Sequence, residues 1–247
     1  MVERPIHRLV DGKVRPELDN LAEESIVTMY SDREIVVKLL ASPIDLEDLA
    51  YGHIFCEARG KIVSITVDGH DLHLTGDFKK RPTEDLLTAA CGACSTGEIE
   101  QPLNLISSTV TLAANLGDMV QDMKEKQTVF SETGGVHAAA VFDQNGNLII
   151  VREDIGRHNA FDKAIGASIR NNIEAKILLL SSRIGWELVA KGVRSGVELI
   201  IAVGAISSAA EALARSSGMT LVGFAASKNP AIVGDLSRII DKPSSSR

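Results

Sequence analysis

Residues 176–203 read KILLLSSRIGWELVAKGVRSGVELIIAV, and this stretch decides the fold. Two continuously apolar runs, residues 176–180 and 199–203, flank a segment near residues 186–194 with the pattern of a helix. Continuously apolar strands are typical of sheets that helices cover on both faces. The stretch therefore predicts a strand, a helix and a second strand of a layered α/β fold.

The same alternation extends to both sides of this stretch. The pattern predicts further helices at residues 112–126, 157–170 and 209–216, a strand at 221–224, and a hairpin of residues 136–142 and 148–151 across Asn145-Gly146. The order of elements predicts a mostly parallel sheet, in which ligands bind at the carboxyl ends of the strands.

The first eighty residues have a different pattern, mainly β with one helix. We expect a hairpin of residues 25–30 and 34–40, a helix at 45–57, and strands at 63–67 and 72–74. The predicted organisation has four parts. Residues 1–80 form a small β-rich subdomain, and residues 81–102 form a mobile loop. Residues 103–240 form an α/β domain that binds a cofactor, and residues 241–247 form a polar tail.

Composition and charge exclude several classes of protein. Of the 247 residues, 45% are hydrophobic and 24% are charged, which is ordinary for a globular chain. The net charge of −7 gives no general attraction to nucleic acid. The sequence contains no apolar run long enough to span a bilayer and no secretory signal pattern in residues 1–15, so we expect no membrane span and a cytoplasmic location.

The three cysteines are too few for a disulfide scaffold. Cys56 falls in a predicted helix, where we expect it to be buried, whereas Cys91 and Cys94 form a C-x-x-C pair among small residues. Such a pair can bind zinc, cycle as a dithiol or carry sulfur as a persulfide. A structural zinc site needs four ligands, usually with a second close pair. His70 and His73 are the only close histidines, and on a strand they would point to opposite faces, so no metal site is predicted. The residues before Cys91 lack the strand pattern of a thioredoxin-like motif, which argues against the hypothesis that the pair cycles between dithiol and disulfide.

Polar groups also follow several predicted strands. Residues 132–137 lead into one strand, residues 152–159 lead from a strand into a helix, and residues 181–183 and 204–208 follow two more strands. Such loops at one sheet edge suit an anionic or nucleotide ligand. The alternative is a structural role, in which Asp154 caps the helix and Arg157 is solvated.

Several motifs together resemble the formate dehydrogenase accessory sulfurtransferase family, FdhD. They are DLEDL at residues 45–49, CGAC at 91–94, TGGVHAA at 133–139, VREDIGRHNA at 151–160 with Asp162-Lys163, and GMTLVGF at 218–224. The resemblance implies a homodimer with a cytidine-deaminase-like α/β fold and no deaminase activity. It also implies a protein that takes sulfur from a cysteine desulfurase and passes it to the bis(molybdopterin guanine dinucleotide) molybdenum cofactor, before the cofactor enters formate dehydrogenase.

The resemblance also assigns roles to residues. Cys91 becomes the persulfide carrier and Cys94 its assistant, while the guanine dinucleotide is expected to contact Phe224, Ala225, Ala226, Ser227, Lys228 and Asn229. The family usually has arginines in this last segment, and here Lys228 is its only charge. The other candidate cofactor contacts are Gly135, His137, Arg157, His158, Asn159 and Arg183.

Two alternative functions remain at this point. One is a chaperone that holds the molybdenum cofactor without transferring sulfur. The other is a zinc or dithiol redox module built on Cys91 and Cys94.

Overall fold

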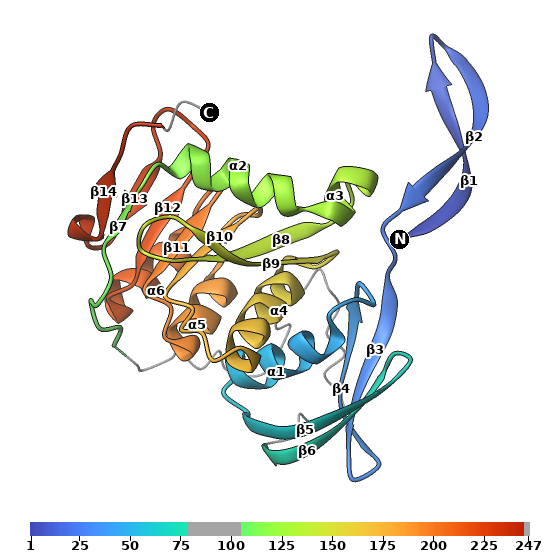
Figure 1. Cartoon of the computed structure of the whole chain (residues 1–247), viewed down its shortest axis with the longest axis horizontal. Helices are drawn as coiled ribbons and strands as arrows, with labels where there is room; N and C mark the ends of the chain where they lie inside the picture. Colours follow the sequence, from blue (N-terminus) through green and yellow to red (C-terminus); the bar gives the residue numbers. More distant parts are fainter. Residues whose placement is uncertain (79–104, 245–247) are drawn as a thin grey trace.

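A six-stranded sheet forms the centre of the protein in the computed structural model, which describes residues 1–78 and 105–244. The strand order is β13-β12-β11-β10-β8-β9 (Figure 1). The strands are β8 (His137–Phe142), β9 (Leu148–Asp154), β10 (Ile177–Leu180), β11 (Leu199–Ala202), β12 (Thr220–Gly223) and β13 (Ala231–Val233). This arrangement confirms the predicted α/β class.

The pairing within this sheet is mixed, which corrects the prediction of a mostly parallel sheet. Only β10, β11 and β12 pair in parallel, because α5 (Trp186–Ser195) and α6 (Ser208–Ser217) carry the chain back between them. The predicted hairpin folds β9 back on β8, β8 runs antiparallel to β10, and β13 returns antiparallel to β12 after a short loop.

Helices cover both faces of the sheet (Figure 1). Alternate residues of the buried strands enter two different cores, as the alternation of side chains in a strand requires. Leu178 and Leu180 pack with α4 (Arg157–Arg170), α5 and α6, whereas Ile177 and Leu179 pack with α2 (Leu116–Lys126). The short helix α3 (Thr128–Thr133) continues from α2 after Gln127.

The N-terminal part forms a second sheet, with the order β4-β3-β6-β5. Its strands are β3 (Ser25–Ser31), β4 (Glu34–Ala41), β5 (Gly60–Asp68) and β6 (Asp71–Phe78). The helix α1 (Leu46–Cys56) packs Leu49 and Ile54 into a third core on this sheet. Figure 1 shows α1 between this sheet and α4.

The contact between α1 and α4 depends on two glycines. A Cβ atom on Gly52 would lie 1.7 Å from the carbonyl oxygen of Asp162, and one on Gly166 would lie 1.8 Å from that of Asp48. Both obstacles are backbone atoms, so only glycine allows the helices to approach this closely. This crossing fixes α4, which begins at the polar sheet edge, against the N-terminal part.

One expectation at the boundary of an element was wrong. The helix predicted from residue 112 begins at Leu116, because residues 112–114 form β7 (Leu112–Ala114), which pairs with β14 (Ile239–Asp241). The first residues are a hairpin of β1 (Val2–Val10) and β2 (Lys13–Leu21) that projects from the body (Figure 1). The 3-10 helix η1 (Leu236–Arg238) precedes β14.

The predicted domain boundaries stay predictions, and the loop at residues 81–102 lies outside the described residues. None of the helices within residues 1–78 and 105–244 is long and apolar enough to cross a membrane.

Candidate functional site at the edge of the central sheet

The loops that carry the polar motifs meet at one edge of the central sheet. His137 at the start of β8 pairs with Asp154 at the end of β9. Ser181, which follows β10, donates its N–H to Ala138 O at 3.0 Å, and its Oγ accepts the Ala138 N–H at 2.9 Å. The loop after β11 joins them, since Gly204 N–H donates to Ser182 O at 3.1 Å. Motifs far apart in the sequence thus form one polar rim.

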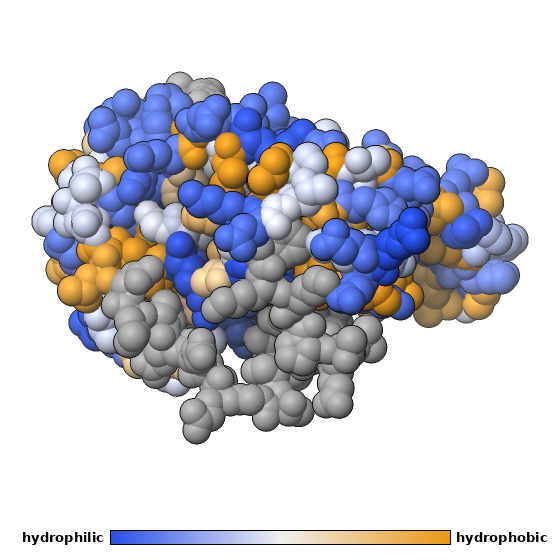
Figure 2. All heavy atoms as spheres, turned by 90° about the horizontal axis from the view of Figure 1, so that it is seen from below, coloured by the Kyte–Doolittle hydropathy of each residue, from blue (hydrophilic) through white to orange (hydrophobic). Residues whose placement is uncertain are grey.

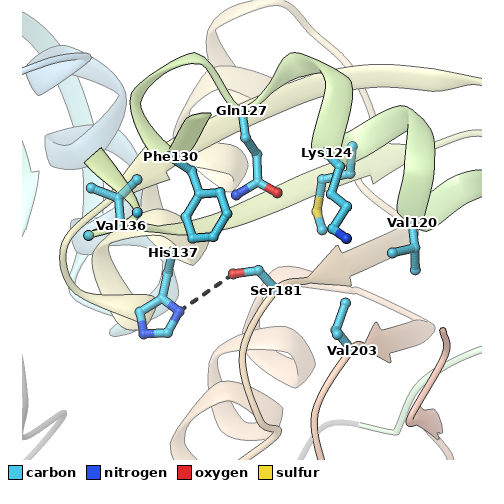
Figure 3. Close-up of a pocket in the computed structure, with 11 residues that line it drawn as sticks. Val120, Lys124, Gln127, Phe130, Val136, His137, Ser181 and Val203 are labelled. Carbon is cyan, nitrogen blue, oxygen red and sulfur yellow. Dashed lines mark hydrogen bonds between the residues drawn. The ribbon is translucent and has the colours of Figure 1, made fainter. Parts of the chain in front are cut away.

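A cavity of about 380 Å³ opens at this rim, between α2, α3 and the sheet edge (Figure 3). Apolar side chains form much of its wall, and four polar side chains reach it. The lining residues are Val120, Met123, Lys124, Gln127, Phe130, Gly134, Gly135, Val136, His137, Ser181 and Val203. The size and mixed lining are typical of a small-molecule site.

His137 contributes a neutral imidazole to the rim of the cavity. Its Nδ1 lies 3.5 Å from Ser181 Oγ, at the long limit of a hydrogen bond (Figure 3). Partial burial lowers the pKa of His137, the nearby Arg157 guanidinium lowers it further, and Asp154 acts in the opposite direction. His137 therefore offers hydrogen bonding without a positive charge at neutral pH.

The turn into α4 is held by Asp154, which is fully buried. Its carboxylate accepts the Gly156 N–H at 2.8 Å and the Asn159 Nδ2–H at 3.1 Å, and it forms an ion pair with Lys163 Nζ at 2.6 Å. Asn159 also donates to Leu40 O at 2.8 Å. The structure thus ties Asn159 into the interior. Asp154 has a structural role, but it does not cap the helix, because the N-cap residue is Gly156 and no described side chain caps α4.

His158 is buried in the first turn of α4, and within the described residues neither of its ring nitrogens has a hydrogen-bond partner. Burial lowers its pKa to about 4, and the charges of Lys191 and Arg157 act in the same direction. Glu187 Oε2 is 4.0 Å from its Nε2. His158 is consequently unprotonated at neutral pH.

A buried charge cluster lies behind this turn. Lys191 Nζ contacts both carboxylate oxygens of Asp162, at 2.8 and 2.9 Å, and Glu57 Oε1 at 2.7 Å. His53 Nδ1 is 3.2 Å from Asp162 Oδ2, so His53 is a buried packing residue. The sequence indicated that Asp162 belonged to a motif, but its partners come from α1 and α5 and could not be identified from spacing.

Cys56 is buried, as predicted. Burial raises the pKa of its thiol well above the ordinary value, and the nearby Asp162 carboxylate raises it further. Its Sγ lies 3.2 Å from Ser195 Oγ. Because the thiolate is the nucleophile, a buried neutral thiol is unsuited to sulfur chemistry.

Comparison with known proteins gives the family of the chain. The model of the FdhD/NarQ family matches residues 22–240. The chain belongs to the FdhD/NarQ family. It is 31% identical over 222 residues to the "Sulfur carrier protein FdhD" of Sulfurisphaera tokodaii, covering 84% of this chain and 87% of that protein. It is 34% identical over 238 residues to the protein of the same name from Nocardia farcinica, covering 86% and 85%.

A solved structure supports the fold. The chain resembles a crystal structure described as a formate dehydrogenase accessory protein from Desulfotalea psychrophila, with a TM-score of 0.79 and 20% identity. The alignment covers 97% of this chain and 99% of that one. At this identity the likeness shows that the two proteins share a fold.

The segment at residues 224–229 lies beside the rim. Phe224 N–H donates to Gly204 O at 3.0 Å, and Ser227 N–H donates to Phe224 O at 2.8 Å. Phe224 is 48% exposed and has a φ of 56°, which is uncommon for a non-glycine residue. Ala225 is buried, whereas residues 226–229 and Arg183 are exposed.

The structure does not test the predicted cysteine pair. Cys91 and Cys94 lie in residues 79–104, outside the described residues, and their roles stay predictions. In the part of the chain that the structure describes, no group of three His, Cys, Asp or Glu side chains is placed to hold a metal ion.

The sequence did not single out Lys124, Gln127, Phe130 or Ser181, which line the cavity. Lys124, Gln127 and Phe130 lie in and between α2 and α3, where their pattern is that of an ordinary amphipathic segment. Ser181 was noted only as part of a polar loop. Nothing in the spacing of these residues indicates that α2 covers the sheet edge.

Proposed function

We propose that this chain is a sulfur carrier protein that serves the maturation of formate dehydrogenase in the cytoplasm. Family membership and the names of the relatives support this function. The structural observation that carries it is the junction of the TGGVHAA and REDIGRHN motifs, where His137 pairs with Asp154 beside a cavity. Residues of the TGGVHAA motif thus line one side of a cavity where a ligand fits.

The proposed chemistry begins at Cys91. Its thiolate attacks the outer sulfur of a persulfide on a cysteine desulfurase, which forms a new S–S bond on Cys91 and breaks the S–S bond of the donor. The donor cysteine leaves as a thiolate with the electron pair. If the Cys94 thiolate then attacks the Cys91 sulfur, a disulfide forms and the outer sulfur leaves as sulfide. In solvent this second step loses the sulfur as free sulfide. When the acceptor is bound, the same step transfers the sulfur to it.

The proposed acceptor is the bis(molybdopterin guanine dinucleotide) molybdenum cofactor, which is cargo here. Its guanine dinucleotide is proposed to lie along Phe224 to Asn229, where the exposed residues 226–229 and the Lys228 charge suit an anionic ligand. The remaining proposed contacts are Gly135, His137, Arg157, His158 and Arg183. Asn159 would support them indirectly, through Asp154. A cysteine desulfurase, formate dehydrogenase and a second copy of the chain are the proposed partners.

The direct test is sulfur loading. The purified chain is incubated with a cysteine desulfurase and cysteine, and its intact mass is measured with and without a reductant. We expect the wild-type chain to gain the mass of one sulfur atom, and the reductant to remove it. Cys91→Ala should gain no sulfur, whereas the control Cys56→Ala, at a buried cysteine, should gain it like the wild type. Unchanged loading of Cys91→Ala would overturn the assignment.

The same variant separates sulfur carriage from cofactor holding. If Cys91→Ala still matures formate dehydrogenase to full activity in cells that lack the native protein, the chain acts as a holding chaperone. Stoichiometric zinc in the purified wild-type protein would instead support a metal module.

A further inference from the structure

The inference starts from Gln127, which lies between α2 and α3. Its side chain is 4% exposed and points into the cavity beside Phe130 and Lys124 (Figure 3). No group within residues 1–78 and 105–244 hydrogen-bonds to its carboxamide. Buried polar groups are nearly always paired, so an amide that has no partner among the described residues and faces a cavity is available to the polar edge of a ligand there.

The other lining groups restrict the shape and charge of that ligand. Val120, Met123, Val136 and Val203 offer apolar contact, and Phe130 presents a ring on which a flat group can stack. At about 380 Å³ the cavity is large enough for one small planar ring system with a short substituent. The walls therefore favour a flat molecule with apolar faces.

The polar groups indicate what the edge of that molecule carries. A carboxamide presents a donor and an acceptor side by side, so it pairs with a lactam edge, whose N–H and C=O have the complementary order. Lys124 supplies a positive charge for an acidic substituent. His137, whose pKa is lowered, and Ser181 complete the rim as neutral hydrogen-bonding groups.

The position of the cavity decides between the two lactam rings that the proposed cargo contains. The segment from Phe224 to Asn229, proposed to contact the guanine, joins the rim at Gly204, one residue after the cavity residue Val203. The cavity and this segment thus lie on neighbouring parts of one rim. A ligand with two lactam heterocycles can place one on each.

We propose that the cavity binds a pterin ring, with Gln127 as the residue that reads its lactam edge, Phe130 as the stacking face and Lys124 as the partner of its acidic substituent. This inference rests on the proposed function, because that function supplies a cargo with a pterin. It adds a separate subsite, formed by α2 and α3, to the segment expected to hold the guanine.

The test uses the full-length chain and 6-carboxypterin, a fluorescent pterin with a carboxylate. Its binding is measured by the change in pterin fluorescence. We expect saturable binding that Gln127→Met weakens about tenfold or more and that Lys124→Met also weakens. The matched control is Gln121→Met on α2, since Gln121 is exposed and pairs with Glu125 at 3.0 Å. Equal affinity in Gln127→Met and wild type would overturn the proposal.

Two comparison ligands sharpen the result. 2-Naphthoate has a similar size and charge but no lactam, so its affinity should be the same for wild type and Gln127→Met. GMP has the same lactam edge on a purine. GMP binding that is tighter than pterin binding and equally dependent on Gln127 would assign the cavity to guanine and overturn the pterin assignment.

Measurements of stability and of sulfur loading distinguish failure of the pterin proposal from failure of the proposed sulfur carriage. Without ligand, Gln127→Met should melt at the same or a higher temperature, because it removes no hydrogen bond to a described group. Loading of Cys91 by the desulfurase should be unchanged. Normal loading without pterin binding overturns this inference alone, whereas pterin binding without loading overturns sulfur carriage alone.

Discussion

At the scale of single residues, Lys191 and His158 show two ways of burying a base. The Lys191 ammonium lies between the carboxylates of Asp162 and Glu57, and the net effect of these partners is to raise its pKa although burial alone would lower it. His158 has no hydrogen-bond partner among the described residues, and burial keeps it neutral. Each case leads to a separate prediction about stability.

Replacing Lys191 should strongly destabilise the fold. Lys191→Met leaves the buried Asp162 and the partly buried Glu57 without their cation, and breaking a buried pair in this way costs about 3–5 kcal/mol. Urea unfolding followed by circular dichroism measures the change. The control is Lys228→Met, on an exposed residue, which should change stability by less than about 0.5 kcal/mol. Equal stability of the two variants would contradict the prediction.

His158 should make the fold sensitive to acid. Its pKa is about 4 in the folded protein, against about 6.5 in an unfolded chain, so the unfolded state binds the proton first as the pH falls. The stability contributed by neutral His158 is therefore complete above about pH 6.5 and is lost between about pH 6.5 and 4, by roughly 3 kcal/mol. Thermal melts across this range should show a smaller slope for His158→Gln. An unchanged slope would argue against the buried neutral state.

At the scale of elements, the contact between α1 and α4 is the least tolerant of change. Gly166→Ala places a Cβ against the Asp48 carbonyl, so the helices must separate along their length, at a cost of about 3 kcal/mol or more. The control is Gly117→Ala on α2, where the nearest obstacle is the Asn115 side chain at 3.1 Å. We expect that variant to change stability by no more than about 1 kcal/mol in a urea titration.

Local patterns predicted most elements, because their hydrophobic periods match single strands and helices. Residues 25–41 form the predicted hairpin, and 157–170 form the predicted helix. The exceptions depend on distant partners: residues 112–114 become a strand only because residues 239–241 pair with them. The direction of β13 likewise depends on how the chain returns to the sheet.

The candidate site was only partly predictable for the same reason. Polar residues after apolar strands indicated the rim, since strand ends share an edge of the sheet. Gln127 could not be identified, because its significance comes from facing a cavity that α2 closes over the sheet. His53 also looked ordinary in the sequence, yet it pairs with Asp162, more than a hundred residues away.

At the scale of the whole molecule, the β1–β2 hairpin stands apart from the body. Its residues belong to none of the three buried cores, and the family model begins only at residue 22. Leu9, Val14 and Leu18 are 71, 66 and 62% exposed. Figure 2 shows apolar residues on the surface at that end of the molecule. One described link to the body joins Asn20 to Glu132 at 3.4 Å.

Removing the hairpin should therefore leave the rest folded. We expect a chain that starts at Ala22 to melt within about 2–4 °C of the full protein, which corresponds to roughly 1 kcal/mol at this size. Differential scanning calorimetry measures the shift, and sulfur loading on Cys91 should be unchanged. A larger loss of stability would show that the hairpin contributes to the cores.

The glycine crossing of α1 and α4 also has a consequence during protein synthesis. About a hundred residues separate the end of α1 at Cys56 from the start of α4 at Arg157. At about 5–20 residues per second, a ribosome needs roughly 5–20 seconds to deliver the second helix after the first. During that interval the nascent chain carries a helix docked on one side only. We expect protease to cut the ribosome-bound chain near α1 until α4 has emerged.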